Sequence, residues 1–279
     1  MNQLPISKRV QIISLLVEGN SLRSTSRITG CSINTVTKLL VEVGKACGKF
    51  HSDNVIHLQS KRIQCDEIWS FVYAKDKNVP TEMKEEGKVG DVWTWTAIDA
   101  DSKLIVSWLV GDRTADTGLV FMKDVAKRLA NKVQLTTDGH QAYLSAVINT
   151  FDDFAVDYAQ LVKLYGGSGD AAGKYSPAEC IGTKKTTVRG NPDKEHISTS
   201  FVERQNLTMR MHMRRFTRLT NAFSKKIENH CYAIALHFVY YNFVKVHKTL
   251  RITPAMEAGL AKRPMNIEDI IELTNDNSN

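Results

Sequence analysis

The feature that most constrains the fold is a succession of apolar runs between residues 62 and 162 of this 279-residue chain. Three runs have the length and composition of β-strands, at residues 62–73, 91–99 and 104–110. Segments of alternating type follow them: a helical pattern at 117–130, a strand at 132–137, a helical pattern at 141–150 and a strand at 155–162. Three strands followed by alternating helices and strands predict an α/β fold, in which helices flank a mixed sheet.

An all-helical segment is expected before the strands. Residues 7–46 contain no proline, and their apolar residues recur at helical spacing. The three expected helices occupy residues 7–18, 21–29 and 32–45. Ser21 and Ser32 are suitable N-caps, and Gly30 marks a tight corner between the second and third helices. This pattern is typical of a helix-turn-helix domain, which we assign to residues 1–46.

The third of these helices is the one expected to read DNA. The side chains predicted to point outward from it are Asn34, Thr35 and Lys38, and those predicted to face the core are Ile33, Val36 and Leu40. Arg23 and Arg27 add positive charge on the preceding helix. Trihelical segments also occur with a purely structural role, so these basic residues are what favours DNA binding here.

The rest of the chain divides by composition. Residues 47–60 lose the helical periodicity and are predicted to form a linker. Residues 61–255 contain the expected sheet and form a larger second domain, with an extended loop at 166–197 that is rich in glycine, lysine and turn-forming residues. The helices expected after this loop occupy residues 198–215 and 221–244, and residues 256–279 form a C-terminal tail.

Three acidic residues stand where a sheet and a helix can bring them together. Asp138 directly follows one strand-like run, Asp66 interrupts another, and Glu203 lies near the start of an expected helix. Hard divalent cations prefer carboxylate oxygens, and two such cations can activate an oxygen nucleophile and neutralise charge during phosphodiester cleavage. Simpler interpretations remain open: Asp138 with Gly139 forms a turn, and Asp66 forms a buried ion pair with an arginine.

The helix that contains Glu203 belongs to a basic stretch, because no acidic residue occurs between Arg204 and Ile227. Arg210 follows Glu203 by two helical turns, so both side chains are expected on one face, about 10.5 Å apart along the axis. There, Arg210 would hold a DNA phosphate beside the proposed metal site. Further residues expected to contact DNA are Arg204, Arg214, Arg215 and Arg218. A basic face that binds nucleic acid without chemistry is the alternative.

Charge and cysteine content limit the class of protein. Lysine and arginine exceed aspartate and glutamate by 37 to 30, a formal charge of +7, which suits a polyanionic partner but also fits a mildly basic enzyme. The five cysteines are scattered without a Cys-x-x-Cys pair, which argues against a disulfide framework and a zinc site. Apolar runs fall short of a signal peptide or a membrane span, so we expect a soluble intracellular protein without a membrane partner.

Several short motifs together resemble the DDE transposases of bacterial insertion sequences, most closely the insertion-sequence-one family. The resemblance covers most of the chain. Its segments are Gln64-Cys-Asp-Glu-Ile-Trp-Ser70, Asp91-Val-Trp-Thr-Trp-Thr-Ala-Ile-Asp99, Gln134-Leu-Thr-Thr-Asp-Gly-His140, Ser200-Phe-Val-Glu-Arg-Gln-Asn206 and the closing segment at 241–254. The motifs are specific in combination and unspecific singly.

This resemblance implies a fold and a site. The fold would be RNase H-like, and Asp66, Asp138 and Glu203 would bind Mg²⁺, with Mn²⁺ able to replace it. Arg210 would be the fourth catalytic residue, at a place where relatives often carry a basic side chain. The helix-turn-helix domain would bind the terminal inverted repeats of the element. Relatives can carry a cysteine-based zinc element ahead of that domain, but this sequence contains no such cluster, so we expect no zinc.

The resulting hypothesis is a transposase that binds double-stranded DNA at transposon ends, cleaves it in a metal-dependent reaction and joins the freed strand to target DNA. We expect a homo-oligomer that holds two ends together, in the cytoplasm of a prokaryote and in association with the nucleoid. Two alternatives stay open. One is a sequence-specific DNA-binding regulator with an inactive RNase H-like domain, and the other is a nuclease or resolvase that acts without transposition.

Overall fold

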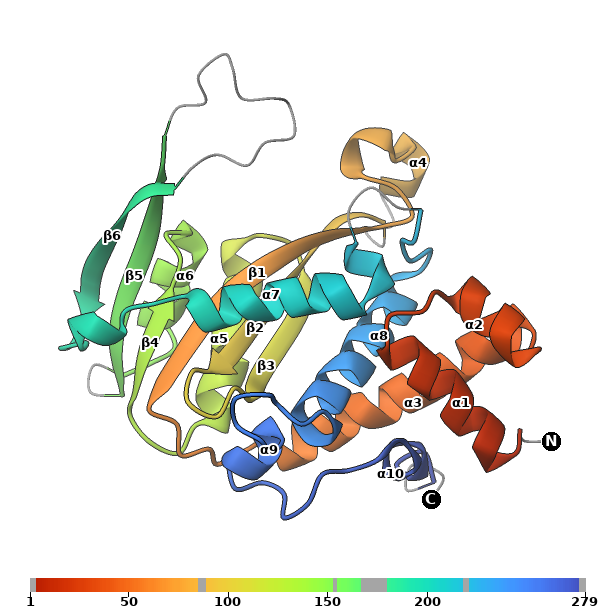
Figure 1. Ribbon diagram of the computed structural model, residues 1–279. Coiled ribbons are helices and arrows are strands. Elements are labelled where there is room, and N and C mark those ends of the chain that lie inside the picture. The colour runs from red at the N-terminus through yellow and green to blue at the C-terminus, as the bar shows by residue number, and fades with distance from the viewer. Residues whose placement is uncertain (1–3, 85–88, 153–154, 167–179, 218–220, 276–279) are drawn as a thin grey trace.

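The computed structural model describes residues 4–84, 89–152, 155–166, 180–217 and 221–275. These residues form a six-stranded sheet with the strand order β3-β2-β1-β4-β5-β6 (Figure 1). The strands are β1 (Arg62–Val72), β2 (Gly90–Asp99), β3 (Ile105–Gly111), β4 (Val133–Thr137), β5 (Val156–Tyr165) and β6 (Cys180–Arg189). The acidic positions expected from the sequence therefore lie on or beside its two middle strands, β1 and β4.

The connections between strands explain why the sheet is mixed. β1, β2 and β3 pair antiparallel, whereas β4 is parallel to both β1 and β5. Parallel neighbours need a crossover connection, which the helices α5 (Ala115–Arg128) and α6 (Gln141–Ile148) provide. The predicted fold class, an α/β RNase H-like mixed sheet with flanking helices behind a helical N-terminal region, is confirmed.

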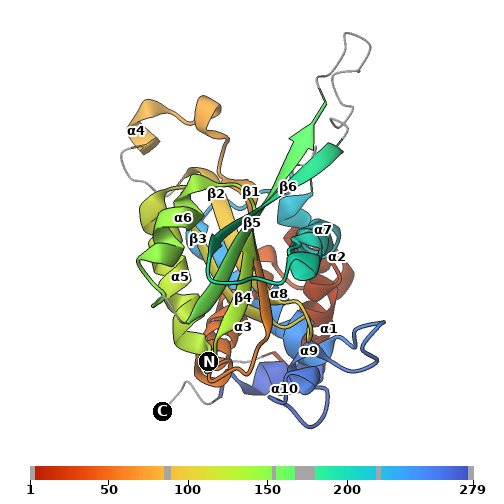
Figure 2. The same cartoon turned by 90° about the vertical axis from the view of Figure 1, so that its left-hand side faces the viewer.

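Helices cover both faces of the sheet. Figure 2 shows α5 and α6 on one face and α7 (Ser200–His212) on the other. The first turn of α7 is fastened to β1, because Gln64 Oε1 accepts the backbone N–H groups of Phe201 at 2.8 Å and Val202 at 3.2 Å. These two hydrogen bonds determine where the next residue of α7, Glu203, lies over the sheet.

The other helices close the ends and one edge of the molecule. One of them is α8 (Ile227–Val239), which continues into a π-helical segment (Tyr240–Val244) whose Asn242 accepts the N–H of Ile105 on β3 at 2.9 Å. The short elements are η1 (Asp76–Asn78), α4 (Thr81–Lys84), η2 (Lys194–His196), η3 (Arg214–Phe216), α9 (Pro254–Glu257) and α10 (Ile267–Glu272). Within the described ranges, every helix is too short or too polar to cross a membrane.

The N-terminal region contains three helices, as expected: α1 (Ile6–Val17), α2 (Leu22–Thr29) and α3 (Ile33–Asn54). Both predicted caps are formed, because the Ser21 hydroxyl accepts the N–H of Ser24 and the Ser32 hydroxyl accepts the N–H of Thr35. Gly30 ends α2 with a φ of 68°, a left-handed conformation that suits glycine.

Two expectations for this region were wrong. The third helix does not end at Lys45 but continues to Asn54, so most of the segment predicted as a linker is helical. Gly44 and Gly48 interrupt the apolar periodicity, yet they do so where α3 packs closely against α8, and this packing outweighs their low helix propensity. Ile33 was predicted to face the core but is 40% exposed, because it is the first residue of the helix and projects beyond the packed face.

The segment expected to be a loop at 166–197 contains a strand. β6 pairs antiparallel with β5 at the edge of the sheet, and nearly all of its side chains are exposed or half-buried. A strand with no buried face lacks the apolar alternation by which strands are recognised in a sequence. Residues 167–179 of the expected loop lie outside the described part of the chain.

The two helices expected after β6 are shorter than predicted. The first, α7, ends at His212 and is followed by the separate turn η3, while the second starts at Ile227 rather than at residue 221. A single buried cluster of apolar side chains joins the N-terminal helices to the sheet. Its members include Ile12, Leu40, Trp95, Phe121 and Phe238. The N-terminal helices and the sheet thus share one hydrophobic core.

Candidate metal centre

Asp66 and Asp138 lie side by side in the middle of the sheet. β1 and β4 are parallel, and their register places Cys65 opposite Thr137, so the next residue of each chain segment is an aspartate at the same level. The carboxylate of Glu67 lies next to this pair. One oxygen from each of the three carboxylates lies within 4.8 Å of the others. The fold therefore creates a compact acidic cluster from two neighbouring strands.

The carboxylates of the cluster repel one another, and this shows in the pKa of Asp66. Burial, together with the negative charges of Glu67, Asp138 and, more weakly, Glu203, raises the pKa of Asp66 to about 7. Close carboxylate oxygens are the ligand set that hard divalent cations prefer. A neighbouring oxygen, Asn206 Oδ1, is buried without a hydrogen-bond partner among the described residues. The donor atoms thus fit a divalent cation.

Glu67 has its own protein partners on the opposite side of β1. Arg113 Nε donates to Glu67 Oε1 at 2.6 Å, and the Tyr143 hydroxyl donates to Oε2 at 2.9 Å, while only 1% of the Glu67 side chain is exposed. Arg113 also stacks 4.7 Å above the ring centroid of Trp93, and its Nη2 lies 3.9 Å from Asp138 Oδ2. Glu67 therefore anchors a guanidinium beside Asp138.

Asp66 is oriented by α7. Asn206 Nδ2 donates to Asp66 Oδ2 at 2.8 Å, and Asn206 is itself buried. Asn206 follows Glu203 by three residues, so both side chains lie on the face of α7 that is turned to the sheet. Asp138, in turn, accepts the N–H of His140 at 2.9 Å, a contact that closes the turn after β4. Both aspartates thus have one carboxylate oxygen held in place.

Glu203 lies beside this cluster and contacts other groups. Its Oε1 accepts the hydroxyl of Thr199 at 2.6 Å, and its Oε2 forms an ion pair with Lys163 of β5. Its charge raises the pKa of Asp66, but the compact cluster itself consists of Asp66, Glu67 and Asp138. Arg210 lies two turns further along the same helix and is half-buried.

The residues expected to bind DNA fall into two groups. Those with exposed side chains are Arg23, Arg27, Asn34, Lys38, Arg204 and Arg214, and Thr35 is half-buried at the start of α3. Arg215 was expected on the exposed basic face, but its Nε donates to Ser224 at 2.6 Å and burial lowers its pKa to about 10. It turns inward because α7 ends before it and η3 changes the direction of the chain. Arg218 lies outside the described residues.

Sequence reasoning missed four side chains around the acidic cluster: Arg113, Tyr143, Lys163 and Asn206. Asn206 could have been predicted, because it follows Glu203 by three residues and therefore lies on the same face of the helix. The other three are brought to the site by the packing of α6, β5 and the turn after β3, for which the linear sequence shows no periodic pattern.

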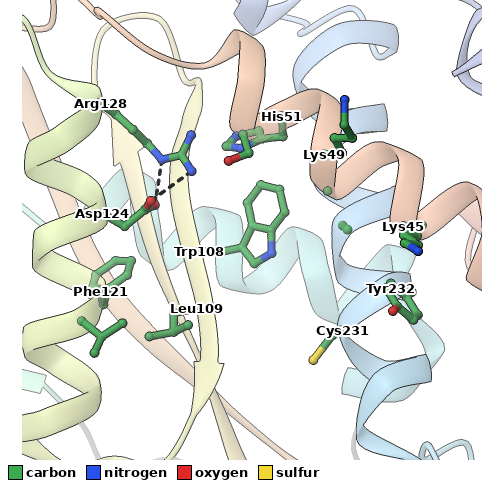
Figure 3. A pocket seen from close by; sticks show the side chains of 15 residues that line it. Lys45, Lys49, His51, Trp108, Leu109, Phe121, Asp124, Arg128, Cys231 and Tyr232 are labelled. Carbon is green, nitrogen blue, oxygen red and sulfur yellow. Dashed lines mark hydrogen bonds and ion pairs between the residues drawn. The ribbon is translucent and has the colours of Figure 1, made fainter. Parts of the chain in front are cut away.

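A separate cavity of about 470 Å³ lies between α3, β3, α5 and α8 (Figure 3). The figure shows Lys45 and Lys49 on α3 and the ion pair between Asp124 and Arg128 on α5, with Nε and Oδ2 2.7 Å apart. Arg128 also donates to the carbonyl of Val55 at 2.9 Å. The described residues that line this cavity do not include the acidic cluster, so the candidate metal centre is distinct from it.

Comparisons with known proteins yield only remote structural similarities. No protein-family model matches the chain, and no curated protein matches it. A piggyBac transposase synaptic complex with hairpin DNA is 9% identical over 96% of this chain and 69% of that chain, with a TM-score of 0.43. A Mos1 mariner paired end complex with Mn is 10% identical over 86% and 77%, with a TM-score of 0.30. The Mos1 strand transfer complex is 12% identical over 86% and 76%, with a TM-score of 0.25. These values are too low to carry a function over to this chain.

Proposed function

We propose that this chain is a DDE-type DNA transposase of the insertion-sequence-one kind, which cleaves DNA at the ends of its element and joins the cut strand to target DNA. The observation that carries the proposal is the register of β1 and β4, which brings Asp66 and Asp138 to one level of the sheet beside a helix that carries Glu203. The sequence motifs around these three residues support the same assignment.

In this proposal, Asp66 and Asp138 hold the divalent cation, Mg²⁺ or Mn²⁺, and Glu203 completes the site from α7. Bound divalent cations supply activation of the attacking oxygen and neutralisation of charge at the scissile phosphate. Asn206 orients Asp66, and the guanidinium of Arg113, held by Glu67, restrains Asp138. These contacts keep the two aspartates in one geometry before DNA arrives.

The basic residues would hold the double-stranded DNA. Arg204 and Arg214 are exposed on and just after α7 and would bind phosphates near the cut, with Arg210 closer to the metal centre. Near the end of α7, where Asn34 lines one cavity with Arg214, the start of α3 would enter a groove of the terminal repeat with Asn34 and Lys38 exposed. Because α3 packs against α8, the two DNA contacts would keep a constant separation.

The test uses the full chain and a DNA duplex that carries the inverted repeats flanking the gene, with Mg²⁺ or Mn²⁺. We expect site-specific cleavage and, with a plasmid target, a joined product. Asp66→Asn and Asp138→Asn should each reduce cleavage about 100-fold or more, because they remove ligands of a cation that contributes several kcal/mol of charge stabilisation. Binding to the duplex should change little.

Asp157→Asn is the matched control. Asp157 is also an aspartate of a strand, β5, but it forms an ion pair with Lys132 and lies outside the acidic cluster. It should retain cleavage. Equal loss of binding and cleavage in Asp66→Asn would contradict the assigned role. Cleavage without a joined product would identify a nuclease or resolvase, and end binding by the wild type without cleavage would identify a DNA-binding regulator.

Joining two ends of an element requires two active sites in one assembly, so we also propose that the protein acts as a homo-oligomer on DNA. Sedimentation of the wild type with and without the end-containing duplex tests this. A complex that contains two or more copies of the chain only in the presence of the duplex is the expected result, whereas one chain per duplex at all concentrations would contradict it.

A further inference from the structure

Lys163 is a positive charge at the acidic site for which the proposed chemistry has no role. It lies on β5, and its ammonium group forms an ion pair with Glu203 Oε2. The other oxygen of the same carboxylate accepts the Thr199 hydroxyl at 2.6 Å. Both oxygens of Glu203 are therefore used by the protein itself, and a cation can reach Oε2 only if Lys163 gives up its contact.

The position of Lys163 follows from the sheet register. β4 and β5 are parallel with Thr137 opposite Gln160, so Lys163 stands beyond the level at which Asp138 leaves β4. Alternation along the strand puts Lys163 on the same face as Leu161, which packs with Ile197 in the segment leading to α7. The ammonium thus sits on the α7 face of the sheet, at the end where the acidic cluster lies.

The ion pair between Lys163 and Glu203 can break at little cost in stability. About one third of each side chain is exposed, 34% for Lys163 and 36% for Glu203, and ion pairs in such a setting add little to folding stability. Lysine also differs from arginine in carrying a compact charge on a flexible stem, which can move several ångströms while its backbone stays in the strand. Breaking the contact therefore leaves the fold intact and frees a mobile cation.

We propose that Lys163 competes with a divalent cation for Glu203 Oε2 and, once displaced, binds a DNA phosphate next to the scissile bond. Like charges repel strongly at contact distance, so Glu203 cannot hold both cations on one oxygen. A displaced ammonium on this face of the sheet is left beside the path of the DNA backbone. The competition rests on the geometry alone, whereas the phosphate contact rests on the proposed function.

The variant Lys163→Met removes the charge and keeps the length of the side chain. The control is Lys132→Met, because Lys132 forms a comparable ion pair with Asp157, at 2.8 Å, on the neighbouring strand pair. Mn²⁺ binding without DNA is measured by calorimetry and by the electron paramagnetic resonance signal of free Mn²⁺. We expect Lys163→Met to bind Mn²⁺ about two- to fivefold more tightly than the wild type, the factor that a surface ion pair represents. Lys132→Met should match the wild type.

The second measurement is the salt dependence of DNA binding, with and without Mn²⁺. With Mn²⁺, the slope of log K against log salt should be smaller in magnitude by about 0.9 in Lys163→Met, the loss of one phosphate contact. Without Mn²⁺, the variant and the wild type should have equal slopes, because Lys163 then remains on Glu203. Lys163→Arg should restore the slope. Thermal unfolding of all variants confirms that each is folded.

Unchanged or weaker Mn²⁺ binding by Lys163→Met overturns the competition and identifies an ordinary structural ion pair. Tighter Mn²⁺ binding together with an unchanged slope overturns the phosphate contact. A wild-type protein that binds no DNA overturns both the proposed function and the phosphate contact, but the Mn²⁺ measurement still decides whether Lys163 competes for Glu203. The two failures are therefore distinguishable.

Discussion

Gly44 of α3 lies against the backbone of Tyr232 in α8, with no room for a side chain between them. A Cβ atom on residue 44 would come within 2.6 Å of Tyr232 Cβ and closer still to the Tyr232 carbonyl oxygen. This contact is part of the extensive packing between α3 and α8. It joins the N-terminal helices rigidly to the part of the molecule that contains the candidate metal centre.

Gly44→Ala should therefore destabilise the protein. Replacing glycine by alanine inside a helix normally stabilises by up to about 1 kcal/mol, but forcing an atom into a packed interface costs about 1–3 kcal/mol. Urea unfolding should show a net loss for Gly44→Ala. Gly48→Ala is the control on the same helix, because its nearest neighbour would be Ala235 Cβ at 3.8 Å, and it should be stabilising. A stabilising Gly44→Ala would contradict the close packing of α3 on α8.

The contact of Arg113 with Glu67 makes a second prediction. Among the described residues, Arg113→Ala leaves the buried carboxylate of Glu67 with the Tyr143 hydroxyl as its partner, and we expect a loss of about 2 kcal/mol, discounted because the Arg113 side chain is 39% exposed. Glu67→Gln should rescue part of this loss, because it removes the uncompensated charge. A double-mutant cycle by urea unfolding measures the coupling. Additive effects of the two substitutions would show that the pair contributes nothing specific.

Buried histidines should make the fold sensitive to acid. Burial, aided by the positive charges of His212 and Lys245, lowers the pKa of His237 to about 3, and burial lowers the pKa of His51 and His230 to a similar value. Each is neutral in the folded protein but protonates in the unfolded chain below its ordinary value of about 6.5. The stability each provides is complete above that pH and is lost as the pH falls toward 3, by up to about 1.4 kcal/mol per pH unit.

His237→Leu tests this sign. Both ring nitrogens of His237 are buried without a hydrogen-bond partner in the described part of the chain, so an apolar side chain of similar size loses no hydrogen bond. We expect the variant to lose less stability than the wild type between pH 7 and pH 5, by about 2 kcal/mol for one proton. Urea unfolding at both pH values measures the difference. An identical pH dependence would mean that His237 binds its proton equally well in the folded and unfolded states.

The proposed DNA contacts can be separated from structural arginines. Lys38→Ala at the start of α3 should weaken DNA binding and reduce the salt slope by about 0.9 without changing the thermal unfolding temperature. Arg215→Ala should instead lower the thermal unfolding temperature and leave the salt slope of DNA binding unchanged. Arg215 is turned inward onto Ser224, so its loss removes buried packing and a hydrogen bond. Fluorescence anisotropy and thermal unfolding compare the two. Loss of stability in Lys38→Ala would argue against a DNA-facing side chain.

Local patterns in the sequence were sufficient for the main elements of the fold. Ser21 and Ser32 mark helix starts through hydrogen bonds to groups three residues away, and the apolar runs of the inner strands reflect burial. Where burial is missing, the pattern fails, and β6 at the sheet edge was predicted as part of a loop. The third helix was predicted to end at Lys45 but continues to Asn54, because its packing against α8 is not visible in the sequence. A periodic pattern of apolar residues forms only where buried and exposed positions alternate regularly along a helix or strand.

The sequence by itself determined the order of strands β1 to β5 and of the helices between them, and it identified Asp66 and Asp138 as candidate ligands. Only the tertiary structure decided which groups stand around them. The contacts of Glu67 with Arg113 and Tyr143 span 46 and 76 residues, that of Lys163 with Glu203 spans 40, and that of Asp66 with Asn206 spans 140. Such contacts depend on how α6, β5 and α7 pack on the sheet, because the positions of whole elements decide which distant side chains meet. A contact between two distant segments produces no periodic pattern in the sequence, so it cannot be predicted from spacing.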